Sequence, residues 1–504
     1  MKDYLIKRPM LICAISCVII AFSGHKVRLS LPFIAIALSL IFAYFLCIKK
    51  SNTYAVVTII LMAMLVSTFL TLKKTDKLFK LKNQKTNCKF TVCETTDKED
   101  TFYTAIVKIN ESDVLPRGTK LSIYYYYDAL SIGDIADGEL KIEQISDEYK
   151  PNFISRGIYL KASCNKYTKT FKSNRILKAV GKLRHYIEST LFGNLEYSEA
   201  STLTALLLGN SDYFSPRFAQ NVKSAGVSHV MVVSGMHLGI ILTLFISLFE
   251  KIIYNKYLKS LLQIIITLAV ALLCGFTMSI LRAGLMFFIS SLAPIVNRKS
   301  NPESSLSAAV VLILLFSPFA YLNAALHLSV LSTFGILSVA IPTVCYLRDR
   351  KIIENKIVFI FVSMVLVTTS ATLMTLPETI RLFGYVSTVG IFTNLFITYA
   401  VTLCVWLGII ALIITPVAAF LAKPFFFVCS VLLKYINYVI NSLGELPFST
   451  VELSGYFSLA AVAVIIIIFE FMLTCKTKID MLKLKEMNEK ILKEGGKSIN
   501  GGNF

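Results

Sequence analysis

The sequence predicts a polytopic α-helical membrane protein of about twelve transmembrane helices, with one small all-β domain inserted near its N-terminus. Hydrophobic residues make up 55% of the 504-residue chain and charged residues only 16%, whereas soluble domains carry about 25% charged residues. Mean hydropathy is +0.67, and apolar runs long enough to cross a bilayer recur along the chain. Residues 73–170 are the exception, because they are polar and rich in strand-forming residues.

The first region, residues 1–72, is predicted to cross the membrane three times. Lys2, Lys7 and Arg8 precede the first apolar run and place the N-terminus in the cytoplasm. No small-residue cleavage site follows that run, so it is not a signal peptide. Three crossings leave the chain outside the cell at residue 73. The predicted spans are 9–23, 31–48 and 53–72.

Residues 73–170 are predicted to form a separate extracytoplasmic domain of five strands. β-branched and aromatic residues are concentrated in 104–109 and 120–127, as strands require. Five short strands in this length are typical of an OB-like barrel, a fold that often binds single-stranded nucleic acid. A small β-sandwich would give a similar pattern. The predicted strands are 88–94, 102–109, 119–127, 137–144 and 157–164.

Four consecutive tyrosines, Tyr124, Tyr125, Tyr126 and Tyr127, lie in the third predicted strand. Side chains alternate along a strand, so two rings face the core and two face outward. Outward rings suit base stacking, with Lys120 available for a phosphate, whereas inward rings serve packing alone. Both interpretations of the tyrosines remain open from the sequence.

Residues 171–225 connect this domain to the membrane body through three predicted helices. The first has apolar residues at helical spacing with lysines between them, which is typical of a helix lying in the membrane interface. Ser215 and Pro216 fit the N-cap and first position of the third helix. The predicted helices are 172–194, 198–208 and 216–224.

Residues 226–475 are predicted to form a membrane domain of nine further spans, followed by a basic cytoplasmic tail, 476–504. Alternation from an external start at 229 places the basic loops and the tail in the cytoplasm, as the positive-inside rule requires. The net charge of +20 therefore reflects cytoplasmic loops. Part of the positive charge lies in the external segment, where it suits an anionic polymer. The spans are 229–249, 260–276, 279–297, 303–321, 325–346, 357–375, 386–417, 424–443 and 456–474, of which 386–417 is longer than one crossing needs.

A polar motif stands at the entrance of the first of these nine spans. It contains Gly226, His229, Ser234, Gly235 and His237, in a chain with five histidines in all. Polar and ionisable groups at membrane depth usually mark a pathway or a site. We interpret them as a polar seam lining a conduit; the alternative is hydrogen bonding that only holds the helices together.

The spacing of this motif, Gly-x-x-His-x4-Ser-Gly-x-His, resembles the core motif of the ComEC competence-protein family. The resemblance extends to several other motifs between residues 200 and 400. They are Ala205-Leu-Leu-Leu-Gly209-Asn210, Ser279-Ile-Leu-Arg282-Ala283-Gly-Leu-Met286, Leu328-Ser329, Gly335-Ile336, Leu376-Pro377, Phe383-Gly384 and Asn394-Leu395.

The resemblance implies a channel that passes single-stranded DNA inward across the cell membrane during natural transformation, with an OB-like domain outside. It implies as partners single-stranded DNA, membrane lipids, a DNA receptor and a cytoplasmic motor or helicase, and it allows a homodimer. Gly226, His229, Ser234, Gly235, His237, Arg282, His327 and Asn394 are the candidate channel-lining residues. Arg282 faces either the conduit, where it meets phosphates, or the interface. His327 departs from the family, which usually has glutamine there.

No cofactor, metal site or enzymatic activity is expected. The chain has no complete nucleotide-binding loop, since Gly495-Gly-Lys-Ser498 lacks the first glycine, and no His-Glu-x-x-His motif. Many members of the resembled family continue into a metallo-β-lactamase-like nuclease with a His-rich cluster. No histidine follows His327, so we expect this nuclease to be missing.

Three cysteines of the polar domain allow one disulfide in an extracytoplasmic setting, Cys164 with Cys88 or Cys93. Most of the other cysteines lie in or beside apolar spans and are expected to be small core residues.

Two other functions fit parts of the pattern. An intramembrane serine hydrolase would use Ser234 with His237 or His327, although Val232 replaces the first glycine of the rhomboid-type Gly-x-Ser-Gly arrangement. A small-solute or lipid transporter would also tolerate a polar seam and an external β-domain. Binding of single strands by the polar domain would distinguish DNA uptake from both.

Overall fold

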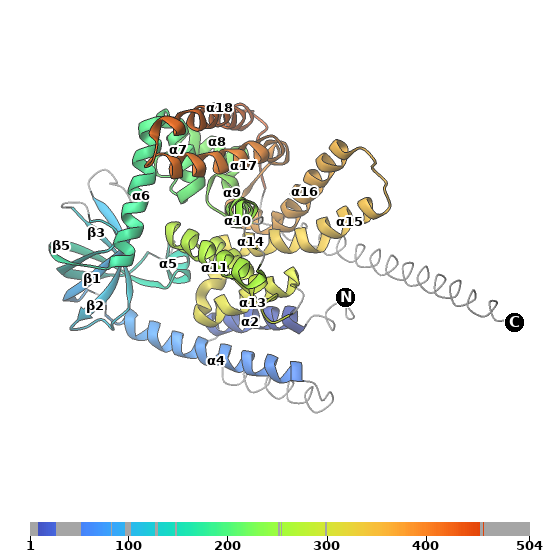
Figure 1. Cartoon of the computed structure of the whole chain (residues 1–504). Coiled ribbons are helices and arrows are strands. Elements are labelled where there is room, and N and C mark those ends of the chain that lie inside the picture. The colour runs from blue at the N-terminus through green and yellow to red at the C-terminus, as the bar shows by residue number, and fades with distance from the viewer. Residues whose placement is uncertain are drawn as a thin grey trace.

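A computed structural model shows a five-stranded barrel at one end of a large helical body (Figure 1). The structure describes residues 9–26, 52–81, 83–95, 102–126, 130–146, 149–249, 253, 255–297, 300–453 and 457. Of the predicted spans, 31–48 and 456–474 lie outside these residues, as does the C-terminal tail.

The polar segment folds into a closed barrel with the strand order β1-β2-β3-β5-β4, in which β4 pairs back onto β1. β3 and β5 are parallel and the other neighbours are antiparallel. Five strands closed in this way form an OB-like barrel, as the sequence predicts. The strands are β1 Lys85–Thr95, β2 Tyr103–Ser112, β3 Lys120–Tyr125, β4 Asp134–Glu143 and β5 Ile158–Ser173, with helix α5 Lys150–Ser155 between the last two.

Apolar side chains from all five strands fill the barrel. Phe90, Val107, Ile123 and Leu140 come from four different strands and are all 0% exposed, and alternation along the strands directs them to the same interior. Tyr125 is also buried, and its hydroxyl accepts a hydrogen bond from the Leu130 amide. This interior is a packed core.

The predicted disulfide does not form in the structure, in which Cys88, Cys93 and Cys164 are free thiols. Cys88 and Cys164 both point into the barrel, but β4 lies between their strands and pairs with both. Two strand spacings separate their backbones by roughly 9.5 Å, and a disulfide needs Cα atoms closer than about 7 Å. Cys93, the other predicted partner of Cys164, is only half-buried, whereas Cys164 is buried, and both are free thiols.

Two N-terminal helices pack along the lower edge of the body in Figure 1. They are α2 Pro9–Lys26 and α4 Asn52–Phe79. α4 runs directly into the barrel, and the Ser67 hydroxyl donates to the Leu315 carbonyl of a later helix. The barrel is therefore carried on the end of a long apolar helix.

Helix α6, Arg175–Asn194, runs from the barrel across the ends of the helices behind it (Figure 1). Asn174 caps it by accepting from the amides of Ile176 and Leu177. Two short helices follow, α7 Tyr197–Leu208 and α8 Pro216–Ser224. Ser215 caps α8 through the Phe218 amide, as its sequence predicts.

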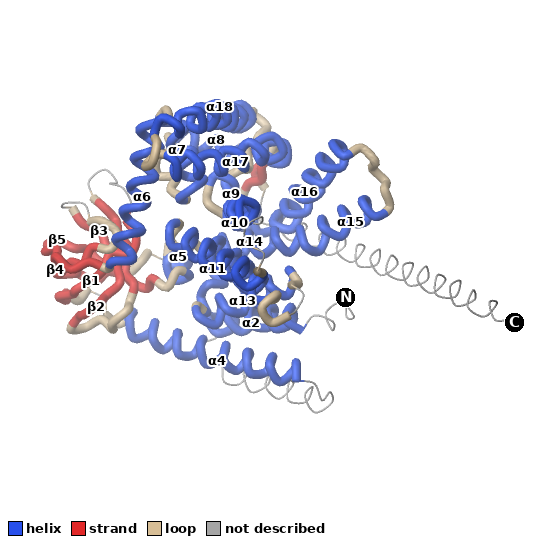
Figure 2. The backbone as a smooth tube through the Cα atoms, in the orientation of Figure 1, coloured by secondary structure: helices blue, strands red, loops and turns tan. Residues whose placement is uncertain are grey.

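The helices of the body continue from residue 228 to residue 444. They are α9 Ser228–Met231, α10 Gly235–Phe249, α11 Lys256–Leu273, α12 Met278–Leu292, α13 Pro302–Phe316, the 3₁₀-helix η1 Pro318–Leu322, α14 Ala324–Gly335, the π-helix η2 Ile336–Ala340, α15 Ile341–Asp349, α16 Lys356–Phe383, α17 Gly390–Ile414 and α18 Ala419–Gly444. A two-stranded ribbon joins β6 Tyr385–Ser387 to β7 Thr450–Glu452. Figure 2 shows the strands gathered in the barrel, apart from a short piece of this ribbon within the helical body.

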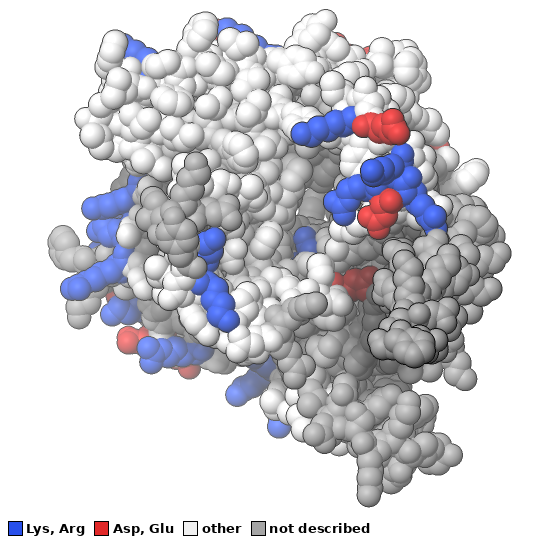
Figure 3. Space-filling view, turned by 45° about the vertical axis from the view of Figure 1, so that its right-hand side comes forward, with Lys and Arg blue, Asp and Glu red and all other residues white. Residues whose placement is uncertain are grey.

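Five helices within the described residues are long and apolar enough to cross a membrane, and α10, α12 and α13 are shorter apolar helices. The total of about twelve spans remains a prediction. The long run 386–417 begins with the end of the ribbon, and α17 starts at Gly390. Figure 3 shows a broad uncharged surface over the helical body, with groups of Lys and Arg side chains to either side of it.

Candidate functional site

The central motif lies where the chain breaks between two helices. α9 ends at Met231 and α10 begins at Gly235, so the predicted span 229–249 is broken near its start. Val232, at the end of α9, is extended. Ser234 is the N-cap of α10, and its carbonyl accepts the first intrahelical bond from the Leu238 amide.

His237 completes this cap. Its Nδ1 accepts from the Ser234 amide at 3.2 Å and lies 3.2 Å from the Ser234 hydroxyl. The imidazole thus stands where a capping box has Glu or Gln, three residues after the capping serine. Because Nδ1 is an acceptor here, a neutral ring carries its proton on Nε2. His237 is 0% exposed, and its Nε2 has no partner within the described residues.

Gly235 brings α10 against α12. A Cβ at this glycine would lie 2.8 Å from Arg282 Nη2 and 2.9 Å from the Ala283 methyl group. Any side chain would therefore displace the guanidinium, and the close approach of the two helices requires glycine.

Arg282 is buried within the helical body, at 6% exposure. Its Nε donates to Ser329 Oγ at 2.8 Å, and Nη1 lies 3.1 Å from Met286 Sδ. Its burial favours an interior position over surface snorkelling. The arginine instead connects α12 to α14 within the body.

α14 is joined to α16 by a second polar contact. His327 Nδ1 lies 2.6 Å from Glu378 Oε1, and His327 Nε2 contacts the Tyr321 carbonyl. Arg381 donates to both oxygens of the same carboxylate. The sequence analysis missed Glu378, although an acidic residue directly after Leu376-Pro377 in an apolar span is a detectable signal.

The remaining candidates also make contacts between helices. Asn394 on α17 donates to Thr368 Oγ1 on α16 at 3.1 Å. Gly226 has φ of +72°, and a Cβ there would lie 2.7 Å from the Ser387 side chain. Polar or close glycine contacts thus link α10, α12, α14, α16 and α17 in succession.

His229 differs from the other histidines of the body. Its side chain is exposed, whereas that of His237 is buried. The break at 232–234 separates His229 from His237, so the two histidines do not lie on one helix.

The outer face of β2 and β3 forms the second part of the candidate site. Tyr124 and Tyr126 face outward there and pack edge-to-face with each other and with Phe102. Tyr127 lies outside the described residues. The Tyr124 hydroxyl donates to Glu143 at 2.6 Å, and Lys161 Nζ lies 5.0 Å from its ring centroid. Burial and this carboxylate raise the pKa of Tyr124, so the phenol stays neutral.

Two lysines lie further along the same pair of strands. Lys108 and Lys120 are exposed and directly opposite each other on β2 and β3. Like charges opposite each other in a sheet are destabilising, and neither lysine has an ion-pair partner among the described residues. An anionic ligand would relieve this repulsion. Phe102 and Lys108 were not among the predicted residues.

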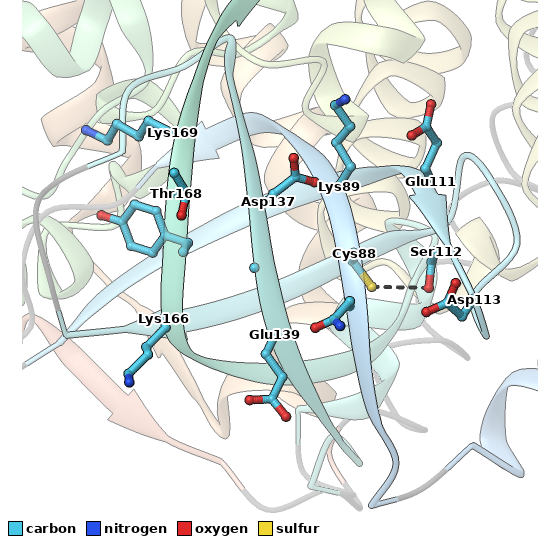
Figure 4. A pocket seen from close by; sticks show the side chains of 13 residues that line it. Cys88, Lys89, Glu111, Ser112, Asp113, Asp137, Glu139, Lys166, Thr168 and Lys169 are labelled. Carbon is cyan, nitrogen blue, oxygen red and sulfur yellow. Dashed lines mark hydrogen bonds between the residues drawn. The ribbon is translucent and has the colours of Figure 1, made fainter.

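The groove on the β1–β4 side of the barrel carries charges of both signs, unlike the β2–β3 face. Figure 4 shows its side chains, with Cys88 donating to Ser112 Oγ at 3.2 Å. Its volume is about 1030 Å³. Its charged lining residues are Lys89, Lys166, Lys169, Glu111, Asp113, Asp137 and Glu139. Carboxylates outnumber lysines there, so this groove is unsuited to a phosphate backbone and the tyrosine face is the better candidate.

A family model described as Competence protein matches residues 206–478, more than half of the chain. The chain belongs to the competence protein family. The match covers all the motif residues of the helical body described above and leaves out the barrel.

Two curated relatives are similar to parts of the chain. ComE operon protein 3 of Bacillus subtilis is 21% identical over 273 residues, which is 54% of this chain and 34% of that protein. The uncharacterized protein MG316 of Mycoplasma genitalium is 34% identical over 121 residues, 24% of this chain and 31% of that protein. The chain thus matches about a third of the length of each relative. No solved structure matches it.

Proposed function

We propose that this competence protein is a membrane conduit that passes single-stranded DNA across the cell membrane during transformation. The observation that carries the proposal is a set of polar contacts on neighbouring helices of the body: Ser234 with His237, Arg282 with Ser329, and His327 with Glu378. Gly235 brings the first of them against Arg282. Polar and charged groups are costly at membrane depth and are expected beside a pathway.

The barrel is proposed as the outer receiving platform. Aromatic faces with neighbouring lysines suit single strands, since every base stacks and every nucleotide carries a phosphate. The Asn323 amide donates to the Ser155 hydroxyl of α5 at 3.0 Å, so the barrel is held against the η1–α14 junction. Predicted alternation places this junction outside, on the side proposed for the barrel.

The remaining features of the proposal follow from this arrangement. The protein is multi-pass, with the barrel extracytoplasmic and both termini cytoplasmic. A DNA receptor outside and a motor or helicase inside are its proposed partners, together with membrane lipids and a second copy. The conduit guides a strand passively and performs no hydrolysis. The imidazole acceptor of His237 already caps α10, which leaves Ser234 without a free base on its own helix.

His237→Leu tests the conduit. The variant removes a polar lining group and the cap acceptor, whereas His237→Gln retains a capping-box acceptor. His185→Leu, at an exposed position of α6, is the matched control. We expect His237→Leu to accumulate in the membrane and to block entry of labelled DNA into a nuclease-resistant state, with external binding intact.

The same variants distinguish a conduit from a purely structural contact. If His237 only caps α10, the leucine variant should lose protein level and uptake in proportion, and the glutamine variant should restore both. Normal accumulation with normal DNA entry in His237→Leu would contradict the conduit.

A further inference from the structure

Arg282 is a buried cation without a buried anion. Within the described residues its polar contacts are a hydroxyl and a thioether, both neutral. Nη2 has no hydrogen-bond partner there and stands beside Gly235. A buried guanidinium normally has a carboxylate, because the desolvation of an unpaired charge is costly. Arg381 on α16, by contrast, has Glu378.

The same place holds the positive end of a helix. Gly235 and Met236 are the first two residues of α10, and their amides have no partner within the described structure because the first turn of a helix has no acceptor inside it. The helix dipole adds positive potential at this end. Ser234 directs its own amide to His237 Nδ1, so the next amides are left for a ligand.

Gly235 brings the Arg282 guanidinium and the N-terminal amides of α10 together in one site. With no side chain, it lets the guanidinium approach the first turn, where a Cβ would lie 2.8 Å from Nη2. We propose that Arg282 and the N-terminal amides of α10 bind one phosphodiester group of the passing strand. This inference rests on the proposed conduit, and it assigns the chemical group that this point of the conduit recognises.

A phosphodiester fits the geometry and the task. The guanidinium fork donates two parallel bonds to phosphate oxygens, and a helix N-terminus supplies backbone donors to the same kind of anion. One arginine and one helix end form a single site, which is weak enough for a strand to leave again. Conduction requires this balance between entry and release.

The test uses the full chain purified in a maltoside detergent without phosphate. The probe is thymidylyl-(3′→5′)-thymidine, and its neutral methylphosphonate analogue has the same bases without the charge. We expect the diester, at about 100 times its Kd, to raise the Tm by several degrees, and the analogue to leave it unchanged. Arg282→Gln and Gly235→Ala should both lose this increase. Arg348→Gln, the same substitution at an exposed arginine of α15, should retain it.

Three results would overturn the site. The diester has no effect on wild type, or Arg282→Gln keeps the full increase, or phosphatidylglycerol micelles raise the Tm through Arg282 while the dinucleotide does not. The last result would make a lipid headgroup the occupant. Arg282→Gln should also be no less stable than wild type without ligand, since it removes an unpaired buried charge; a lower Tm would mark a structural arginine.

Measuring DNA entry into cells that carry the same variants distinguishes the proposed phosphate site from the proposed conduit. Loss of the diester effect together with loss of entry supports both. Loss of entry in Arg282→Gln, with no diester effect in wild type, leaves the conduit and rejects the phosphate site. A diester effect that depends on Arg282, with entry unchanged, rejects the assignment of the site to a passing strand.

Discussion

At the scale of single residues, the motif glycines act through space and backbone angle. Gly226 has positive φ and contacts Ser387 and Gly390 across two segments far apart in sequence. Gly235 has no such angle and is required by the close approach of Arg282 and Ala283 on α12. Glycine is therefore required at the two motif positions for different physical reasons.

Gly226→Ala should be destabilising for both reasons. Its Cβ would lie 2.7 Å from Ser387 Cβ and 2.9 Å from Gly390 Cα, at φ of +72°. We expect a loss of about 2 kcal/mol, roughly half of it from the backbone angle. Thermal unfolding of the purified protein measures the change.

The control is Gly157→Ala, which has φ of +76° and nothing within 4 Å of the added Cβ. It isolates the cost of the angle, so it should lower the Tm by less than Gly226→Ala. Equal losses would show that the contact with Ser387 contributes nothing.

Cys164 provides a prediction for pH. Burial raises the pKa of its thiol to about 11, whereas an unfolded cysteine titrates near 8.5. The raised pKa means that this thiol's contribution to stability is complete below about pH 8.5 and is lost as the pH rises toward 11. Cys164→Ala should therefore show a smaller loss of Tm than wild type between pH 8 and pH 10.5.

Alkylation provides an independent check on this thiol. Iodoacetamide at pH 8 should leave Cys164 unmodified in the folded protein and modify it after denaturation, as peptide mass spectrometry would show. Rapid modification of the folded protein would contradict the buried position.

At the scale of elements, the barrel has two faces of different chemistry. Tyr126 and Lys108 belong to the β2–β3 face, and Lys166 belongs to the groove beside β4. The charges of the groove are mixed, while the lysines of the tyrosine face lack ion-pair partners among the described residues. The two faces should respond differently to DNA.

Binding of a labelled oligothymidine to the full chain tests this difference. Lys108→Gln should reduce the slope of log affinity against log salt by about 0.7, the value for one phosphate contact on a single strand. Tyr126→Ala should weaken binding by about 1–3 kcal/mol through the loss of one stacked base. Lys166→Gln is the matched control and should change neither; an equal effect of Lys166→Gln would reject the assignment of the face.

At the scale of the whole molecule, the connections between helices fall at two ends of the body. The barrel approaches the α11–α12 connection, where a Cβ at Gly275 would lie 3.8 Å from Glu94 Oε1. Tyr159 of β5 also packs edge-to-face against Phe319 of η1. Lys256 donates to Asn297 at the other ends of α11 and α12. The two groups agree with the predicted alternation of loops.

This arrangement predicts opposite labelling of two engineered cysteines in a background without the native ones. Lys108→Cys, on the barrel, should react with a membrane-impermeant maleimide in intact cells. Arg348→Cys, at the end of α15, should react only after permeabilisation. Labelling of both from one side would overturn the topology.

Much of the local structure was predictable from the sequence. The barrel follows from β-branched and aromatic residues in alternation, because the period of a strand is short and local. Ser215-Pro216 located the start of α8, because capping involves residues within one turn. The central motif was recognisable because its spacing belongs to a family, and that family was confirmed.

What the sequence determined by itself is therefore the kind of each segment: apolar helices, a polar β-domain, an amphipathic helix and a polar motif between them. Only the tertiary structure decided which polar groups meet. Glu378 reaches His327 from 51 positions away, Arg282 has no carboxylate partner among the described residues, and β4 separates two cysteines that the sequence allowed to pair. Composition and periodicity record how each segment partitions between water and lipid. Partners across helices and strands depend on packing between distant segments, which no local pattern contains.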